Sequence, residues 1–219
     1  MPTESREYLP ALRFPFLTRI YDPVVRLTTR EGTFKRLLLD QANPGPGQRV
    51  LDLGCGTGTL AIQVKRRQAA AEVVGIDADP ETLERAEAKA AEAGVELQLD
   101  EGYSDALPYP DESFHLVLST LFFHHLDPAA KRDTLREIAR VLRPGGELHV
   151  ADWGRASDPV MLAASFSIRL LDGFSNTHDN FAGALPELFE EADLEAAAET
   201  RRLRTPFGSL ALYRARRPS

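Results

Sequence analysis

A glycine-rich turn between an apolar run and an amphipathic segment constrains the fold of this chain more than any other feature. Residues 50–60 read VLDLGCGTGTL, with glycine at alternate positions within the turn. The run 49–53 has the length and composition of a buried strand, and residues 59–67 follow with the apolar spacing of a helix. The stretch therefore predicts a strand, a tight turn and a helix whose N-terminus faces that turn.

The alternation of strand and helix patterns continues along the chain. A second apolar run at 72–77 leads, through the capping pair Asp79-Pro80, into a helix at 81–93. Further strands are predicted at 95–100, 113–120, 146–152, 194–203 and 209–216, and further helices at 128–142, 159–171 and 184–192. Strands that alternate with helices form βαβ units, so we expect an α/β fold with a mostly parallel sheet covered on both faces.

Composition limits the size, the compartment and the partners of the protein. A chain of 219 residues with 43% hydrophobic content builds one full core, so a single domain over 1–219 is expected. Its single cysteine excludes an internal disulfide framework and a Cys-rich zinc site. A net charge of -7 disfavours nucleic acid as a partner. No apolar stretch approaches the roughly 20 residues of a membrane span, and the N-terminus lacks the pattern of a secretion signal, so a cytoplasmic protein is expected.

The glycine turn and the acids beside it indicate the kind of ligand. In an open α/β sheet, ligands bind outside the carboxyl ends of the strands, where this turn is predicted to lie. The spacing is G-x-G-x-G, with Thr59 where a dinucleotide fingerprint requires its third glycine. Asp52 would repel a diphosphate, whereas the ammonium and sulfonium of S-adenosylmethionine suit a carboxylate. Asp77, at the end of the second strand, is placed to accept both ribose hydroxyls.

Four motifs extend this interpretation to a family. They read VLDLGCGTGTLA, VVGIDADPETLERA, LPYPDESFHLVLSTLFFHHL and RVLRPGGELHVADWG, in that order. Together they resemble the successive motifs of class I S-adenosylmethionine-dependent methyltransferases, most closely the small-molecule group that includes the ubiquinone/menaquinone C-methyltransferases. The resemblance covers 49–154 and implies a Rossmann-like, seven-stranded, mostly parallel sheet with helices on both faces and an antiparallel last strand. It also implies a helical arm or lid at 1–47, a cofactor-binding core at 48–154 and acceptor-side helices and final strands at 155–219.

The resemblance assigns the cofactor contacts residue by residue. Asp52 to Gly58 would contact the methionine part, Asp77 the ribose, and Ala78 would lie beside the adenine. Where the family commonly has Asp-Ala after Gly102, this chain has Tyr103-Ser104, so adenine recognition by the Ser104 backbone or by Asp105 stays open. The predicted cofactor contacts are Tyr21, Asp52, Gly54, Cys55, Gly56, Gly58, Asp77, Ala78, Tyr103, Ser104 and Ser119.

The acceptor side is less determined. The segment STLFFHH stands where amino-methylating enzymes carry Asn/Asp-Pro-Pro-Tyr, which favours a small-molecule acceptor with a carbon or oxygen nucleophile over nitrogen. His124 or His125 serves as a base or hydrogen-bond donor, or else has a capping or core role. Asp152-Trp153 is a further candidate for acceptor contact. The segment 173–183 is predicted to be a loop, either carrying His178 to Asn180 toward the acceptor or forming a solvated connection.

Several candidate residues also have a structural interpretation that competes with a functional one. Cys55 is interpreted as a small turn residue and not as a nucleophile, because no base is identifiable near it. His124 and His125 are not expected to bind a metal, since adjacent side chains should diverge and no further ligand stands at helical spacing. The arm 14–21, which ends in Tyr21, either closes over the methionine end of the cofactor or completes the core. The aromatic residues Phe14, Phe16, Phe166, Phe174 and Phe181 either line an apolar pocket or belong to the core.

The sequence also leaves two other functions open. A nicotinamide-dependent oxidoreductase would explain Asp77 and the glycines, but not Asp52 or the missing third glycine. A protein that binds the cofactor without transferring its methyl group is also compatible, because methyl transfer requires no obligatory catalytic residue. The oligomeric state is open.

Overall fold

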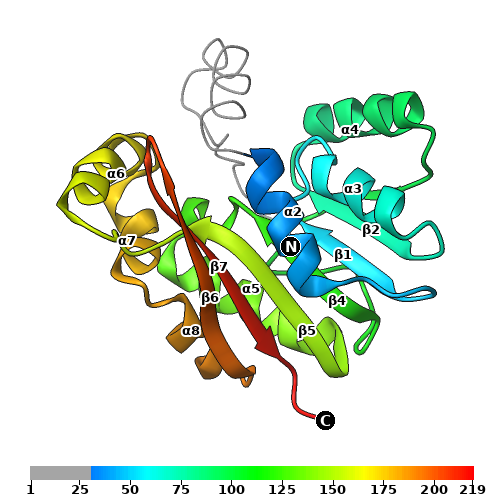
Figure 1. Cartoon of the computed structure of the whole chain (residues 1–219). Helices are drawn as coiled ribbons and strands as arrows, with labels where there is room; N and C mark the ends of the chain where they lie inside the picture. Colours follow the sequence, from blue (N-terminus) through cyan, green and yellow to red (C-terminus); the bar gives the residue numbers. More distant parts are fainter. Residues whose placement is uncertain (1–30) are drawn as a thin grey trace, which may run out of the picture.

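A computed structural model describes residues 31–219, which form one seven-stranded sheet flanked by helices (Figure 1). Tyr21 and the aromatic arm 14–21 lie outside the described residues. The strands are β1 Arg49–Leu53, β2 Glu72–Asp77, β3 Gln98–Glu101, β4 Phe114–Thr120, β5 Leu142–Trp153, β6 Glu195–Thr205 and β7 Gly208–Arg216. The helices are α2 Glu31–Ala42, α3 Thr59–Arg67, α4 Pro80–Ala93, the short 3-10 helix η1 Phe123–His125, α5 Pro128–Val141, α6 Pro159–Asp172, α7 Phe174–Ala182 and α8 Leu185–Glu191.

The order of the strands is β3-β2-β1-β4-β5-β7-β6. The pairs from β3 to β5 are parallel, whereas β7 runs antiparallel to both β5 and β6. The predicted α/β class, with a mostly parallel sheet and an antiparallel last strand, is confirmed. The order also differs from the 3-2-1-4-5-6 arrangement of dinucleotide-binding folds, because a reversed strand is inserted between β5 and β6.

Side chains along each strand point alternately to the two faces of the sheet, so a hydrophobic core lies on each face. On one face, Leu51 and Leu53 of β1 pack with α5 and α8 through a cluster that includes Leu135 and Phe189. On the other face, Val50 belongs to a second cluster with α2, α3 and α6. The helices therefore cover both faces, as the near-continuous apolar strands require.

The described part of the N-terminal arm belongs to this second core. Phe34 and Leu38 of α2 are fully buried. Gln41 at the end of the helix donates to the Tyr213 carbonyl of β7 at 3.0 Å. Residues 31–42 are therefore attached to the middle of the sheet.

Helix α4 begins at its predicted cap. Asp79 accepts hydrogen bonds from two backbone N–H groups of the first turn of α4, with Pro80 at the first position. Asp127 and Asp158 cap α5 and α6 in the same way. Because each cap is a local feature of three or four residues, sequence alone locates it.

The structure differs from the predicted secondary structure at three places. Strand β3 begins at Gln98 and not at 95. The segment 173–183 is not a loop but contains the helix α7, with Gly173 and Gly183 at its ends. The polar sequence of this segment does not predict a helix. The helix is stabilised by the burial of Thr177 and Asn180 against neighbouring elements. Strand β5 begins at Leu142 and not at 146, because a register shift against β4 accommodates the Pro-Gly-Gly sequence.

No helix among residues 31–219 is long and apolar enough to cross a bilayer.

Candidate functional site

The glycine turn after β1 leaves an open surface at the carboxyl ends of the strands. Gly54, Gly56 and Gly58 have φ values of 66°, 54° and 67°, in the left-handed region that favours glycine. The N–H groups of Gly54 and Cys55 both donate to the Ile76 carbonyl at 3.0 Å, which holds the turn against β2. A Cβ on Gly56 would meet no heavy atom of the described residues within 4 Å. A ligand can therefore approach the backbone closely at Gly56.

Asp77 joins the turn to the segment that follows β3. Its two carboxylate oxygens accept from the Gly56 N–H at 2.8 Å and from the Asp79 N–H at 3.1 Å. Its own carbonyl accepts from the Gly102 N–H at 3.0 Å. Burial raises the pKa of Asp77, and the backbone N–H donors oppose that change. A carboxylate offers about four lone-pair positions, so two remain for a pair of hydroxyl donors.

Asp52 lies beneath the turn with an unsatisfied oxygen. Its side chain is 1% exposed. One oxygen accepts from the Ala61 N–H of α3 at 3.0 Å, and the other has no hydrogen-bond partner among the described residues. Burial raises the pKa of Asp52 to about 6, although the Lys35 ammonium and the Ala61 N–H lower it. A buried carboxylate oxygen without a partner suits a positively charged ligand group, so these residues fit the methionine end of S-adenosylmethionine.

Cys55 and Ser119 lie in the same region but point into the protein. The Cys55 thiol is buried and donates to the Gly56 carbonyl at 3.6 Å. Burial raises the pKa of this thiol, so it stays protonated, which supports its interpretation as a small turn residue. The Ser119 hydroxyl is fully buried and donates to the Leu53 carbonyl at 2.9 Å. Ser119 therefore connects β4 to β1.

The predicted adenine side is formed by the residues after β2 and β3. Ala78 is partly exposed next to Asp77, and Tyr103 is 43% exposed. The Ser104 hydroxyl forms a hydrogen bond of 2.7 Å with the buried Thr134 hydroxyl of α5. The side chain of Ser104 is therefore engaged with the protein, and its contact with adenine stays a prediction.

A buried histidine–aspartate pair lies at the carboxyl ends of β4 and β5. His124 follows β4 in η1, and its Nδ1 lies 2.7 Å from the Asp152 carboxylate near the end of β5. Asp152 also accepts from the N–H groups of Phe122 at 3.1 Å and Trp153 at 2.7 Å. Burial lowers the pKa of His124, but the carboxylates of Asp152 and Asp172 outweigh it and the net pKa is raised. In the neutral form of His124, hydrogen on Nδ1 leaves Nε2 as the free nitrogen.

The expectation that His124 and His125 diverge is wrong. Their ring centroids lie 3.9 Å apart at an interplanar angle of 41°. Adjacent side chains alternate sides in a strand, but these two belong to a tight 3-10 turn. Burial and the neighbouring His124 lower the pKa of His125 to about 3, so its imidazole is neutral.

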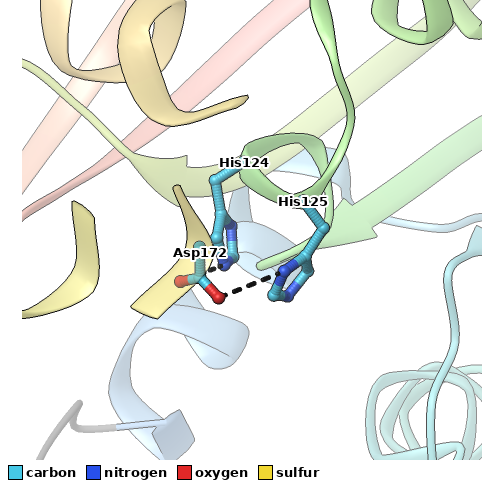
Figure 2. Close-up of side chains that lie close together, drawn as sticks. All are labelled: His124, His125 and Asp172. Atoms are coloured by element: carbon cyan, nitrogen blue, oxygen red, sulfur yellow. Dashed lines mark ion pairs between the residues drawn. The ribbon is translucent and has the colours of Figure 1, made fainter. Parts of the chain in front are cut away.

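Asp172, at the end of α6, completes a group of three side chains that sequence spacing does not predict. Its carboxylate lies 3.5 Å from His125 Nδ1 and 3.8 Å from His124 Nε2, as Figure 2 shows. The only local signal is a carboxylate at the end of an apolar helix, directly before Gly173. Burial raises the pKa of Asp172, and His124 partly opposes this shift.

His178 does not join this group. It is exposed on α7 and lines a surface hollow with Arg155 and Arg169. The residues that follow it anchor the helix. Asp179 lies 3.4 Å from the Lys131 ammonium of α5, and Asn180 donates to the Trp153 carbonyl at 3.4 Å. The contact of His178 with an acceptor remains a prediction.

The strand order, the glycine turn after β1 and the acid that ends β2 are the features that the resemblance to class I methyltransferases predicts. Residues 50–146 match a protein family described as methyltransferase domain. The resemblance predicted from the motifs is therefore confirmed for residues 50–146, which match a methyltransferase domain.

Curated relatives and a solved structure agree with this assignment. The chain is 40% identical over 120 residues to a demethylmenaquinone methyltransferase of Thermus thermophilus, a match that covers 55% of this chain and 54% of that protein. It is 38% identical over 120 residues to a 27-O-demethylrifamycin SV methyltransferase of Amycolatopsis mediterranei, covering 54% of this chain and 43% of that protein. The chain spans about half the length of the curated relatives it matches. The crystal structure of YcgJ from Bacillus subtilis superposes with a TM-score of 0.67 at 20% identity, covering 84% of this chain and 98% of that chain, which supports the fold.

Proposed function

We propose that this protein transfers a methyl group from S-adenosylmethionine to a small organic acceptor. The observation that carries the proposal is the buried, unpartnered oxygen of Asp52 beneath the glycine turn, together with the Asp77 carboxylate beside it. These two acids suit the two ends of the methionine-ribose part of the cofactor, a cation and a pair of hydroxyls. A nicotinamide dinucleotide would instead bring a diphosphate to the buried acid of this turn.

The proposed cofactor position follows from these groups. The open backbone at Gly56 receives the methionine part, and the free lone pairs of Asp77 accept the ribose hydroxyls. Ala78 and the exposed Tyr103 ring flank the adenine, whose amino group bonds the segment 102–105. Tyr21 remains a proposed contact to the methionine end, outside the described residues.

The proposed acceptor lies beside the group formed by His124, His125 and Asp172. This group and the glycine turn both lie at the carboxyl ends of the central strands. Phe122 connects the two: its ring packs on Gly54, and its N–H donates to Asp152, which also contacts His124. The acceptor and the sulfonium methyl would then meet beside this ring, with water excluded by the buried surroundings.

The reaction is an in-line displacement. A carbon or oxygen nucleophile of the acceptor forms a bond to the methyl carbon while the bond to sulfur breaks. The electron pair stays on sulfur, which yields S-adenosylhomocysteine. The proton of the acceptor passes to a base or to water, and the protein contributes mainly alignment and a preorganised environment. We assign activation of the acceptor to the histidine-aspartate group, with His178 as an outer candidate.

The acceptor class is inferred from the relatives and the charge of the chain. The two named relatives are methyltransferases of a demethylmenaquinone and of a 27-O-demethylrifamycin, which supports a small cyclic acceptor with a carbon or oxygen nucleophile. The net charge of -7 disfavours nucleic acid as the acceptor.

Two measurements test the proposal. Calorimetric titration of the full chain should show binding of S-adenosylmethionine and S-adenosylhomocysteine and none of NAD. Binding of NAD as tight as or tighter than that of S-adenosylmethionine would contradict the proposal. A screen with methyl-labelled donor over quinols, phenols, amines and lipid precursors then identifies the acceptor. Cofactor binding without transfer in the whole screen would favour the alternative of a binding protein.

A further inference from the structure

Three side chains from two remote segments converge at the end of the sheet. His124 and His125 come from η1, and Asp172 comes from the last turn of α6. One ligand atom of each, two imidazole nitrogens and a carboxylate oxygen, lies within 4.8 Å of the other two. Figure 2 shows both rings turned toward the same carboxylate. We call these three residues the His–His–Asp cluster.

The spacing inside the cluster suits metal ligands better than hydrogen bonds. The carboxylate lies 3.5 Å from His125 Nδ1 and 3.8 Å from His124 Nε2, beyond the range of a good N–H···O bond. Ligand atoms that surround a tetrahedral zinc ion at about 2.0–2.1 Å lie about 3.3 Å apart. Both carboxylate-to-imidazole distances are near this value, and all three ligand atoms lie within 4.8 Å of one another, so side-chain rotations would bring them onto one ion.

Asp152 supplies the outer partner that metal-binding histidines usually have. Its carboxylate lies 2.7 Å from His124 Nδ1 and is itself held by backbone N–H groups. A carboxylate that accepts from one ring nitrogen fixes the tautomer and directs the other nitrogen, with its lone pair, at the ion. In this structure that other nitrogen, Nε2, faces Asp172.

Asp172 gives independent support, because it is a buried acid without a hydrogen bond. Its side chain is 6% exposed, and it forms no hydrogen bond with any of residues 31–219. A buried carboxylate is costly unless a cation or donors compensate it. Imidazole nitrogens at 3.5 Å and 3.8 Å lie beyond good hydrogen-bond range of this carboxylate, whereas a metal ion between the three groups would bind it directly.

We propose that the His–His–Asp cluster binds a divalent first-row transition ion, with Zn²⁺ as a suitable probe. Two imidazoles and one carboxylate are the ligands of such ions, whereas Mg²⁺ and Ca²⁺ prefer oxygen alone. Three protein ligands leave at least one coordination position open. In a role that rests on the proposed function, this position receives the acceptor oxygen and lowers the pKa of its hydroxyl. Metal binding itself does not depend on that function.

The test uses the untagged full chain after treatment with a chelator. Calorimetric titration with ZnCl₂ should show one equivalent bound, and Co²⁺ should give the visible absorption of a site with nitrogen and oxygen ligands. Asp172→Asn and His125→Ala should each weaken Zn²⁺ binding at least about tenfold, because each removes a direct ligand. Asp111→Asn and His178→Ala, which change exposed residues of the same types, should leave the affinity unchanged.

Binding of S-adenosylhomocysteine to each variant serves as the folding control. If the wild-type chain binds neither Zn²⁺ nor Co²⁺ stoichiometrically, the cluster is only a charged network and the proposal is overturned. The same conclusion follows if both ligand variants bind like the wild type, or if His178→Ala alone abolishes binding. A chain that binds Zn²⁺ but no S-adenosylhomocysteine would contradict the proposed function and leave the metal site standing.

Discussion

The proposed cofactor side and acceptor side of the site are built in different ways. On the cofactor side, the turn 54–58 and the acid Asp77 are tied together by backbone hydrogen bonds at the ends of adjacent strands. On the acceptor side, His124, Asp152 and Asp172 come from η1, β5 and α6, and His124 contacts both acids through its side chain. The first arrangement is determined by local turns, and the second by the packing of segments far apart in the chain.

This difference explains why the two sides respond differently to substitution. A glycine in a left-handed turn has almost no tolerated replacement, because both its conformation and its space are restricted. Side chains that meet across a cavity can be exchanged while the backbone stays in place. We therefore expect substitutions on the cofactor side to lower the stability of the protein and its affinity for the cofactor. Substitutions on the acceptor side should mainly change the rate of methyl transfer.

The largest effect is expected for Gly54→Ala. Its Cβ would lie 2.3 Å from the Phe122 ring, and its φ of 66° is unfavourable for alanine. We expect a loss of about 3–5 kcal/mol in the free energy of unfolding, from strain and overpacking together. Gly47→Ala is the matched control, because its φ is 71° but no heavy atom of the described residues would lie within 4 Å of the Cβ. Denaturant titration that gives equal losses for the two variants would exclude the Phe122 contact as the cause.

Asp77→Ala should weaken binding of S-adenosylhomocysteine by about 2–4 kcal/mol, because charge-assisted bonds to two hydroxyls are lost. The variant also loses the bonds that Asp77 accepts from Gly56 and Asp79, so its melting temperature should fall as well. Asp79→Ala is the control, since it removes the cap of α4 at a cost of about 1 kcal/mol in stability but should leave the affinity intact. Unchanged calorimetric affinity in Asp77→Ala would remove this residue from the ribose site.

The affinity for S-adenosylhomocysteine should rise about tenfold between pH 5 and pH 7, because pairing with its α-ammonium group requires ionised Asp52, whose pKa is raised to about 6 in the free protein. At pH 5 the carboxyl group must release its proton before it can pair with the ammonium. Asp52→Asn should bind more weakly at pH 7 and lose this part of the pH dependence. Calorimetry at several pH values measures the affinity and its pH dependence for both proteins. The same pH dependence in the wild type and in Asp52→Asn would mean that Asp52 does not pair with the ligand.

The smallest effect is expected on the acceptor side, for Asp172→Asn in the metal-free chain. Burial raises the pKa of Asp172 in the folded state, so the native state binds more protons than the unfolded state above pH 3.8, and stability falls as pH rises. Replacing the buried charge should leave the free energy of unfolding at pH 7 unchanged or raise it by up to about 1 kcal/mol. The exposed Asp111→Asn should stay within about 0.5 kcal/mol of the wild type. A marked destabilisation by Asp172→Asn would show that this carboxylate supports the fold.

The accuracy of the sequence predictions follows the same division. Strands β1 and β2, the turn between β1 and α3, and the cap of α4 agree with their predictions, because each depends on a few consecutive residues. Helix α7 was missed, because its stability comes from the burial of Thr177 and Asn180 and not from helix propensity. The stacking of His124 on His125 was missed because a 3-10 turn replaces the continuation of the strand.

The sequence by itself determined the α/β class, the position of the glycine turn and the two acids that bear on the choice of cofactor, since periodicity, caps and turn chemistry act over short distances. Only the tertiary structure decided that Asp152 and Asp172 lie against His124, at sequence separations of 28 and 48 residues. No local pattern encodes that approach, because it depends on how β5 and α6 pack around η1. The physical reason is that backbone conformation depends on neighbouring residues, whereas a cluster of side chains depends on the whole folded chain.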